Sequence, residues 1–165
     1  METLLEIVIG NLLRQHRLKL AVAESCTGGL VGDRLTNIPG SSDYYLGSIT
    51  AYAYEAKRRV LGVSAETLRN FGAVSRETAI EMARGVRSAL VDETLPENVL
   101  GLSVTGIAGP GGGTLEKPVG LVWIGLSAPD GDWAWCYRWN NDRIGNKAAS
   151  AQQALQQAVE YLTEK

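Results

Sequence analysis

The segment AESCTGG, residues 23–29, places a serine where a buried strand ends and a helix begins. In an open α/β sheet, ligands bind in the crevice beyond the carboxyl ends of the strands. Main-chain N–H groups at a helix start can stabilise the alkoxide of Ser25 or a developing oxyanion. The alternative is that Ser25 or Thr27 is only a helix N-cap, a position that both residue types favour.

A serine nucleophile needs a base, and a second segment, YAYEAK, residues 52–57, offers one. The single histidine, His16, falls in an amphipathic surface helix and is a poor candidate for a Ser-His-Asp relay. Lys57 can serve instead if burial lowers its pKa from about 10.4 toward about 7 to 8. Because Arg58 and Arg59 follow it, Lys57 could equally lie on a solvated helix face.

The third segment, SVTGIAGPGGGTLEKPVG, residues 103–120, is rich in glycine after a buried strand. Glycines let the main chain approach a ligand closely and point several N–H groups into one concavity, although a merely flexible connection is the alternative. No Lys-Ser/Thr pair follows at the P-loop spacing. Residues 27–32, TGGLVG, lack the first glycine and the later acidic residue of a dinucleotide fingerprint, which disfavours an oxidoreductase.

Sequence periodicity predicts the elements that position these segments. Helices are expected over residues 2–17, 27–37, 55–61, 66–70 and 75–90, and a last helix carries Ala148, Ala151, Leu155, Val159 and Leu162 on one face. Strands are expected over 18–23, 46–52, 99–105, 119–127 and 133–139, with a loop at 92–98 and a hairpin turn at 129–131. The alternation of helices and strands, with one late hairpin, predicts an α/β protein: a three-layer α/β/α sandwich with a mixed sheet, in one domain over residues 1–165.

Composition narrows the class of partner and site. The 165 residues carry a net charge of -2 without a basic run, which disfavours nucleic acid and membrane surfaces. Met1 is followed by Glu2, and no apolar stretch reaches the roughly 18 residues of a membrane span, so we expect a cytoplasmic protein. Cys26 and Cys136 are expected to be buried thiols, and we predict neither a metal site nor a cofactor.

Together, the three segments resemble the CinA C-terminal domain family, whose enzymes are nicotinamide-nucleotide amidases. The resemblance extends over nearly the whole chain. It implies hydrolysis of the carboxamide of nicotinamide mononucleotide, giving nicotinic acid mononucleotide and ammonia in pyridine-nucleotide salvage. It also implies that Ser25 is the nucleophile, Lys57 its base, and Tyr52 a hydroxyl that orients the lysine or relays a proton.

The resemblance also implies a set of substrate-binding residues. They are Glu24, Thr27, Gly28, Gly29, Tyr54, Thr105, Gly106, Gly109, Gly111, Gly112 and Arg143. Arg143 would hold the phosphate. The chain departs from the family pattern in three places: Tyr54 replaces a usual asparagine, NDR at 141–143 replaces GDR, and Lys147 stands where arginine is frequent.

Longer members of the family resemble this chain only in their C-terminal half and add a molybdopterin-binding-like domain. The chain is therefore either a stand-alone amidase or a fragment of a longer protein, and we expect a homo-oligomer. The alternative function is a CinA-type domain, linked to competence or DNA-damage proteins, that binds a pyridine nucleotide or a protein partner without turnover.

Overall fold

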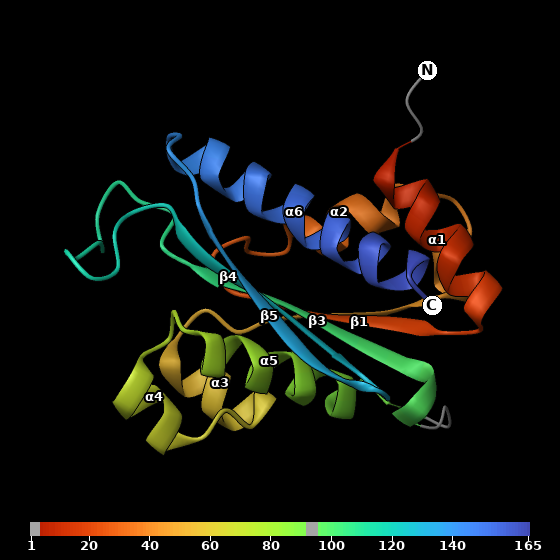
Figure 1. Ribbon diagram of the computed structural model, residues 1–165, viewed down its shortest axis with the longest axis horizontal. Coiled ribbons are helices and arrows are strands. Elements are labelled where there is room, and N and C mark those ends of the chain that lie inside the picture. Colours follow the sequence, from red (N-terminus) through yellow and green to blue (C-terminus); the bar gives the residue numbers. More distant parts are fainter. Residues whose placement is uncertain (1–3, 92–95) are drawn as a thin grey trace.

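Helices cover both faces of a five-stranded sheet in the computed structural model of the chain, which describes residues 4–91 and 96–165 (Figure 1). The strands are β1 Lys19–Glu24, β2 Tyr45–Thr50, β3 Val99–Gly106, β4 Leu121–Ala128 and β5 Gly131–Arg138. The helices are α1 Leu5–His16, α2 Leu30–Thr36, α3 Tyr54–Leu61, α4 Ala65–Phe71, α5 Arg76–Ala89 and α6 Arg143–Thr163. The predicted loop at 92–98 lies partly outside the described residues, and Pro96–Asn98 form a 3-10 turn.

The strand order is β2-β1-β3-β4-β5, which confirms the predicted mixed sheet. Strand β1 pairs in parallel with β2 and β3, whereas β4 and β5 form an antiparallel hairpin that extends the sheet from β3. Because the carboxyl ends of parallel strands meet at one edge, the segments that follow β1, β2 and β3 converge there. These are the three segments with candidate chemistry.

The two helical layers bury separate cores (Figure 1). On one face, α1, α2 and α6 cover the larger core, in which Leu13 and Leu155 are fully buried. On the other face, α3 and α5 cover a smaller core that contains Leu61 and Met82. Both faces of β3 are therefore covered, which explains its continuous apolar sequence. No described helix has the length and apolar character needed to cross a membrane.

Two sequence expectations are wrong in detail. Helix α2 begins at Leu30 rather than at Thr27, because Gly28 and Gly29 adopt positive φ angles of 63° and 110° in the preceding turn. Cys26 is buried as predicted, but Cys136 is exposed. Its side chain opens into a groove between the hairpin and the start of α5, since β5 is an edge strand.

Candidate active site

Ser25 and Lys57 lie next to each other although 32 residues separate them in the sequence. Ser25 directly follows β1 and Lys57 lies in α3, and their Oγ and Nζ atoms are 2.8 Å apart. Only 7% of Ser25 and 1% of Lys57 is exposed. The solvated-face interpretation is therefore wrong for Lys57, and it holds for Arg58 and Arg59, which are exposed.

The contacts of Lys57 define what its amine can do. Its Nζ atom donates to the carbonyl oxygens of Ala51 at 2.9 Å and Tyr52 at 3.1 Å. A neutral amine has two N–H donors and one lone pair, whereas the ammonium form has three donors and no acceptor. In the neutral form, the two carbonyls occupy both donors and the lone pair is left to accept the proton of Ser25.

Burial favours that neutral form. Desolvation lowers the pKa of Lys57 from 10.5 to about 8, within reach of neutral pH. Desolvation has the opposite effect on the neighbouring thiol and raises the pKa of Cys26 to about 12. The thiol therefore stays protonated, and the Ser25 hydroxyl is the neighbouring group from which a neutral lysine can take a proton.

Main-chain hydrogen bonds fix the turn that carries Ser25. Its N–H donates to the carbonyl of Val104 on β3 at 2.9 Å, and its own carbonyl accepts from Gly28 at 3.1 Å. Within the described parts of the chain, the N–H group of Thr27 has no acceptor, and that of Cys26 faces only its own thiol. They are available to an oxygen atom of a ligand beside Ser25.

The carboxylate of Glu24 caps α2 from inside the protein. Glu24 is fully buried, and it accepts hydrogen bonds from the Thr27 hydroxyl at 2.6 Å and from the N–H groups of Gly29, Val31 and Gly32 at 2.9 to 3.1 Å. The N-cap alternative for Ser25 and Thr27 is therefore wrong, since Glu24 takes that role. The helix N–H groups turn toward Glu24 rather than toward Ser25, which sequence reasoning missed.

A cavity of about 170 Å³ opens beside the Ser25 and Lys57 side chains. Its lining residues are Ser25, Cys26, Tyr52, Lys57, Ala73, Val74, Thr105, Gly106 and Ala108. The hydroxyl of Thr105 donates to the carbonyl of Ala73 at 2.7 Å, which ties the end of β3 to the segment before α5. Sequence reasoning did not find Ala73 and Val74, because no residue type in that segment indicates chemistry.

Arg143, the first residue of α6, bridges two of the three segments. It donates to the hydroxyl of Tyr52 at 3.0 Å and to the carbonyl of Gly109 at 2.7 Å. Asn146, one turn later, is buried and donates to the carbonyl of Ala108 at 3.0 Å. A second cavity, of about 470 Å³, adjoins the first at Ala108 and is also lined by Arg143. The glycine-rich segment is thus anchored by α6, a role of Asn146 that sequence reasoning missed.

Comparison with known proteins identifies the family of the chain. The family model of the CinA C-terminal domain matches residues 2–162. The chain belongs to the CinA family. A CinA-like protein of Salinibacter ruber is 48% identical over 159 residues, which are 96% of this chain and 37% of that protein. A putative competence-damage inducible protein of Halothermothrix orenii is 50% identical over 163 residues, 98% of this chain and 38% of that protein. The CinA chain thus spans little more than a third of the length of these relatives.

Solved structures of CinA proteins share the fold. The competence/damage inducible protein CihA of Agrobacterium tumefaciens superposes with a TM-score of 0.84 at 37% identity, covering 97% of this chain and 98% of that one. The competence damage-inducible protein A of Klebsiella pneumoniae gives a TM-score of 0.88 at 30% identity, covering 96% and 95%. These likenesses agree with the predicted α/β class.

Some residues of the CinA chain that the sequence pointed to lie outside the 170 Å³ cavity. Tyr54 is 57% exposed, and Gly111 and Gly112 are exposed in the loop beyond Gly109. A methyl group added at Gly28 would lie 3.8 Å from Nζ of Lys147, which places that amine beside the turn after Ser25. Among the residues described, no group of three or more His, Cys, Asp and Glu side chains could hold a metal ion.

Proposed function

We propose that this CinA chain hydrolyses the carboxamide of nicotinamide mononucleotide to nicotinic acid mononucleotide and ammonia. The observation that carries the proposal is the 2.8 Å contact between Lys57 Nζ and Ser25 Oγ, with the lysine buried and its pKa lowered to about 8. A serine activated by a neutral lysine is suited to attack on an amide carbonyl. Membership of the CinA family supports this choice of substrate through the resemblance described above.

In the proposed reaction, the lone pair of Lys57 takes the proton of Ser25 as Oγ bonds to the carboxamide carbon. The carbonyl oxygen becomes an oxyanion, for which the N–H groups of Cys26 and Thr27 are donors. The Lys57 ammonium protonates the amide nitrogen, the C–N bond breaks, and ammonia leaves an ester on Ser25. Water, deprotonated by Lys57, then attacks the ester carbon, and Ser25 recovers its proton as the acid is released.

The shape and charge of the site support a nucleotide substrate. The cavity beside Ser25 is smaller than the about 300 to 1,000 Å³ of most ligand pockets, so it suits one ring rather than a whole nucleotide. Arg143 and Lys147 lie one turn apart on α6, next to the mouth of this cavity and the turn after Ser25. In the proposal, these two cations hold the phosphate while the nicotinamide ring enters the cavity.

A direct assay tests the proposed activity. Purified protein is incubated with nicotinamide mononucleotide, and nicotinic acid mononucleotide and ammonia are measured, with Ser25→Ala as the control for contaminating amidases. Equimolar products from the unmodified chain alone are expected. Binding of the nucleotide without product would instead indicate the alternative function, a nucleotide-binding module without turnover.

A further inference from the structure

Strand β5 leaves one side of its backbone unpaired at the end of the sheet. Residues 129–130 connect it to β4, with Ala128 opposite Gly131, and in such hairpins the pair flanking the turn is hydrogen-bonded. From this alternation, the residues that direct N–H and C=O groups away from β4 are Asp132, Ala134, Cys136 and Arg138. No residue in the described ranges hydrogen-bonds to these outward main-chain groups.

This edge lacks several features that keep edge strands apart. Strand β5 contains no proline or lysine, and its register with β4 runs without a bulge. At the opposite edge of the sheet, β2 has a register shift against β1, and Gly47 has a φ angle of 143°. An unpaired edge without a proline or a bulge, such as β5, is a template for pairing with another strand.

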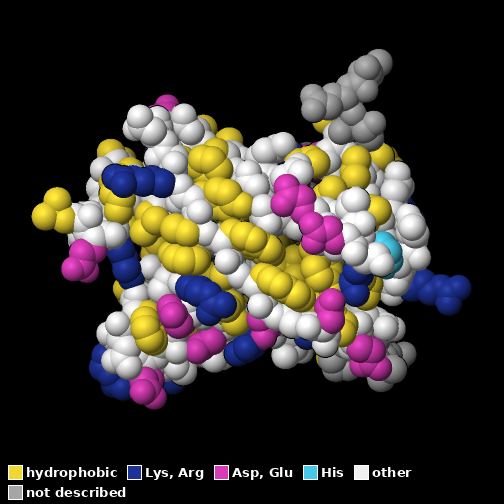
Figure 2. All heavy atoms as spheres, viewed as in Figure 1, with side chains coloured by type: hydrophobic (Ala, Val, Ile, Leu, Met, Phe, Trp, Pro, Cys, Tyr) yellow, Lys and Arg dark blue, Asp and Glu magenta, His cyan; other side chains and the backbone are white. Residues whose placement is uncertain are grey.

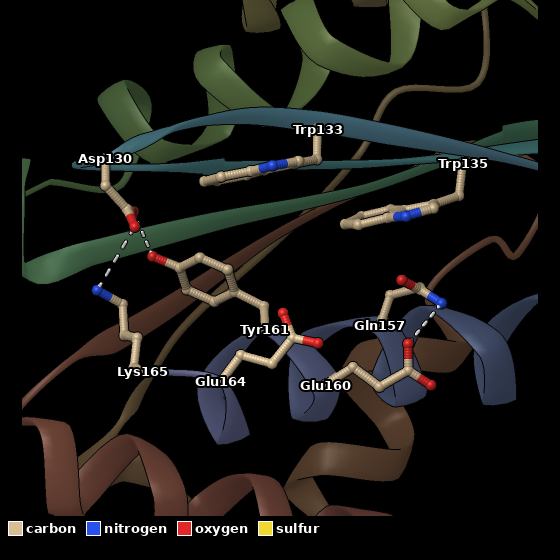
Figure 3. Close-up of a pocket in the computed structure, with 8 residues that line it drawn as sticks. All are labelled: Asp130, Trp133, Trp135, Gln157, Glu160, Tyr161, Glu164 and Lys165. Atoms are coloured by element: carbon tan, nitrogen blue, oxygen red, sulfur yellow. Dashed lines mark hydrogen bonds and ion pairs between the residues drawn. The ribbon is translucent and has the colours of Figure 1, made fainter.

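Aromatic side chains follow the β5 edge on the α6 side. Figure 2 shows a band of hydrophobic side chains across the face on which β5 lies, between α6 and the helices α4 and α5. Trp133 and Trp135 project from β5 toward Tyr161 of α6 and line a hollow of about 400 Å³ (Figure 3). Each of these aromatic residues is only partly buried, so the band has apolar surface left to cover.

We propose that two copies of the chain form a two-fold symmetric dimer by antiparallel pairing of their β5 edges about Trp135. The pairs that this register creates are Asp132 with Arg138, Trp133 with Tyr137, Ala134 with Cys136, and Trp135 with the partner's Trp135. The outward-facing main-chain groups then meet in hydrogen-bonded pairs, and the aromatic residues meet in the closer pairs between them. The second copy thereby continues the sheet and covers the aromatic band.

Several registers would bring the outward main-chain groups of the two β5 strands opposite each other, and charge favours the one centred on Trp135. Arg138 is exposed, and its guanidinium has no ion pair with any residue in the described ranges. When the two-fold axis passes through Trp135, Arg138 lies opposite Asp132 of the second copy. The Asp132 carboxylate also contacts Arg84 of its own chain at 2.6 Å. A shift of the axis to Ala134 places Arg138 opposite Asp130, whose carboxylate is already bonded to Tyr161 and Lys165 on the α6 side of the sheet. A shift to Cys136 places Arg138 opposite Ala134, which carries no charge. Opposite charges directly across an antiparallel pair stabilise it.

Disulfide trapping tests both the dimer and its register. Three forms of the full chain are oxidised under mild conditions: the unmodified chain with Cys136, Ala134→Cys, and Ala134→Cys with Cys136→Ser. Cys26 is buried and does not compete. Only Ala134→Cys places cysteines directly opposite each other, so it should give most of the disulfide-linked dimer. Trapping chiefly in either other form, or in none, would overturn the proposed pairing.

The mass in solution gives an independent test. Light scattering of the unmodified chain should give twice its 17.7 kDa mass. Trp135→Glu places two carboxylates on the axis and should raise the dimer dissociation constant about 100-fold or more, and Arg138→Glu should weaken the dimer at an exposed position. Leu115→Glu is the matched control, because Leu115 is fully exposed outside β5. Circular dichroism checks that each variant is folded. A monomeric unmodified chain, or a Trp135→Glu variant that remains fully dimeric, would contradict the proposal.

Discussion

Lys57 Nζ contacts Ser25 Oγ at 2.8 Å, and its two other polar contacts are main-chain carbonyls rather than carboxylates. This arrangement matters because a carboxylate would stabilise the ammonium form and raise the pKa of the lysine. Carbonyl acceptors hold the amine in place without supplying a full negative charge. The carbonyls at 51–52 thus fix the position of the Lys57 amine, and the burial of Lys57 sets its basicity.

Removal of the Ser25 hydroxyl should abolish hydrolysis while binding persists. Ser25→Ala should lower kcat by at least about 1,000-fold, because the hydroxyl forms the covalent bond. Its affinity for nicotinamide mononucleotide should stay within about tenfold, since the hydroxyl adds little to ground-state binding. Product formation and calorimetric titration measure the two effects. A variant that keeps most of its turnover would point to direct attack by water.

The rate should follow the neutral fraction of Lys57. Burial lowers the pKa of this lysine to about 8, so the ammonium form predominates below that pH and cannot accept a proton. The rate should therefore rise about tenfold per pH unit below about pH 8 and level off above it. The pH dependence of kcat/KM, measured with the unmodified chain, gives this slope and the pH at which the rate levels off. A value of kcat/KM that does not change between about pH 6 and about pH 9 would exclude Lys57 as the base.

A change of Lys57 to arginine separates charge from basicity. Lys57→Arg should be nearly inactive, because a guanidinium stays protonated near neutral pH and has no lone pair to accept the serine proton. Arg58→Lys is the matched control, since Arg58 is exposed on the same helix. Initial rates at saturating substrate compare the two. Turnover by Lys57→Arg with an unshifted pH profile would make Lys57 a structural residue and the Tyr52 hydroxyl the next candidate base.

Glu24 should matter for stability more than any exposed carboxylate. Four donors converge on its two oxygens, and Glu24→Gln replaces one acceptor by an NH₂ group that faces N–H groups. We expect a loss of about 2–4 kcal/mol in the free energy of unfolding, measured in urea. Glu55→Gln is the control, because Glu55 is exposed and bonds only to surface arginines. An equal effect of the two substitutions would contradict the capping role of Glu24.

The sequence predicted the fold class well, because hydrophobic periodicity is a local property and the alternation of helices and strands indicates an α/β sheet. It could not separate Lys57 from Arg58 and Arg59, since burial of one residue on α3 depends on how the helix packs against α5 and the turn after β1. It also assigned Glu24 to the substrate. A carboxylate before a glycine turn looks the same in sequence whether it faces a cavity or caps the following helix.

Arg143 and Tyr52 are in contact at 3.0 Å beside the cavity. Arg143 bonds to the Tyr52 hydroxyl and to the Gly109 carbonyl, so it can act on the substrate phosphate or only hold the mouth of the cavity in shape. If it binds phosphate, as proposed, Arg143→Ala should raise KM for nicotinamide mononucleotide about 10- to 100-fold, with a smaller effect on kcat. The same variant should lose its preference for the nucleotide over the nucleoside without phosphate.

Tyr52→Phe is the matched control for that variant, because it removes the contact with Arg143 but leaves the guanidinium in place. It should keep the preference for the phosphorylated substrate. Its kcat should fall if the hydroxyl relays a proton, and should stay near the original value if the hydroxyl only orients Arg143. If Tyr52→Phe loses the phosphate preference as fully as Arg143→Ala does, the guanidinium alone does not hold the phosphate, and the contact with Tyr52 is part of the phosphate site. If Arg143→Ala keeps the preference, Arg143 does not bind the phosphate, and the cation that holds it is Lys147.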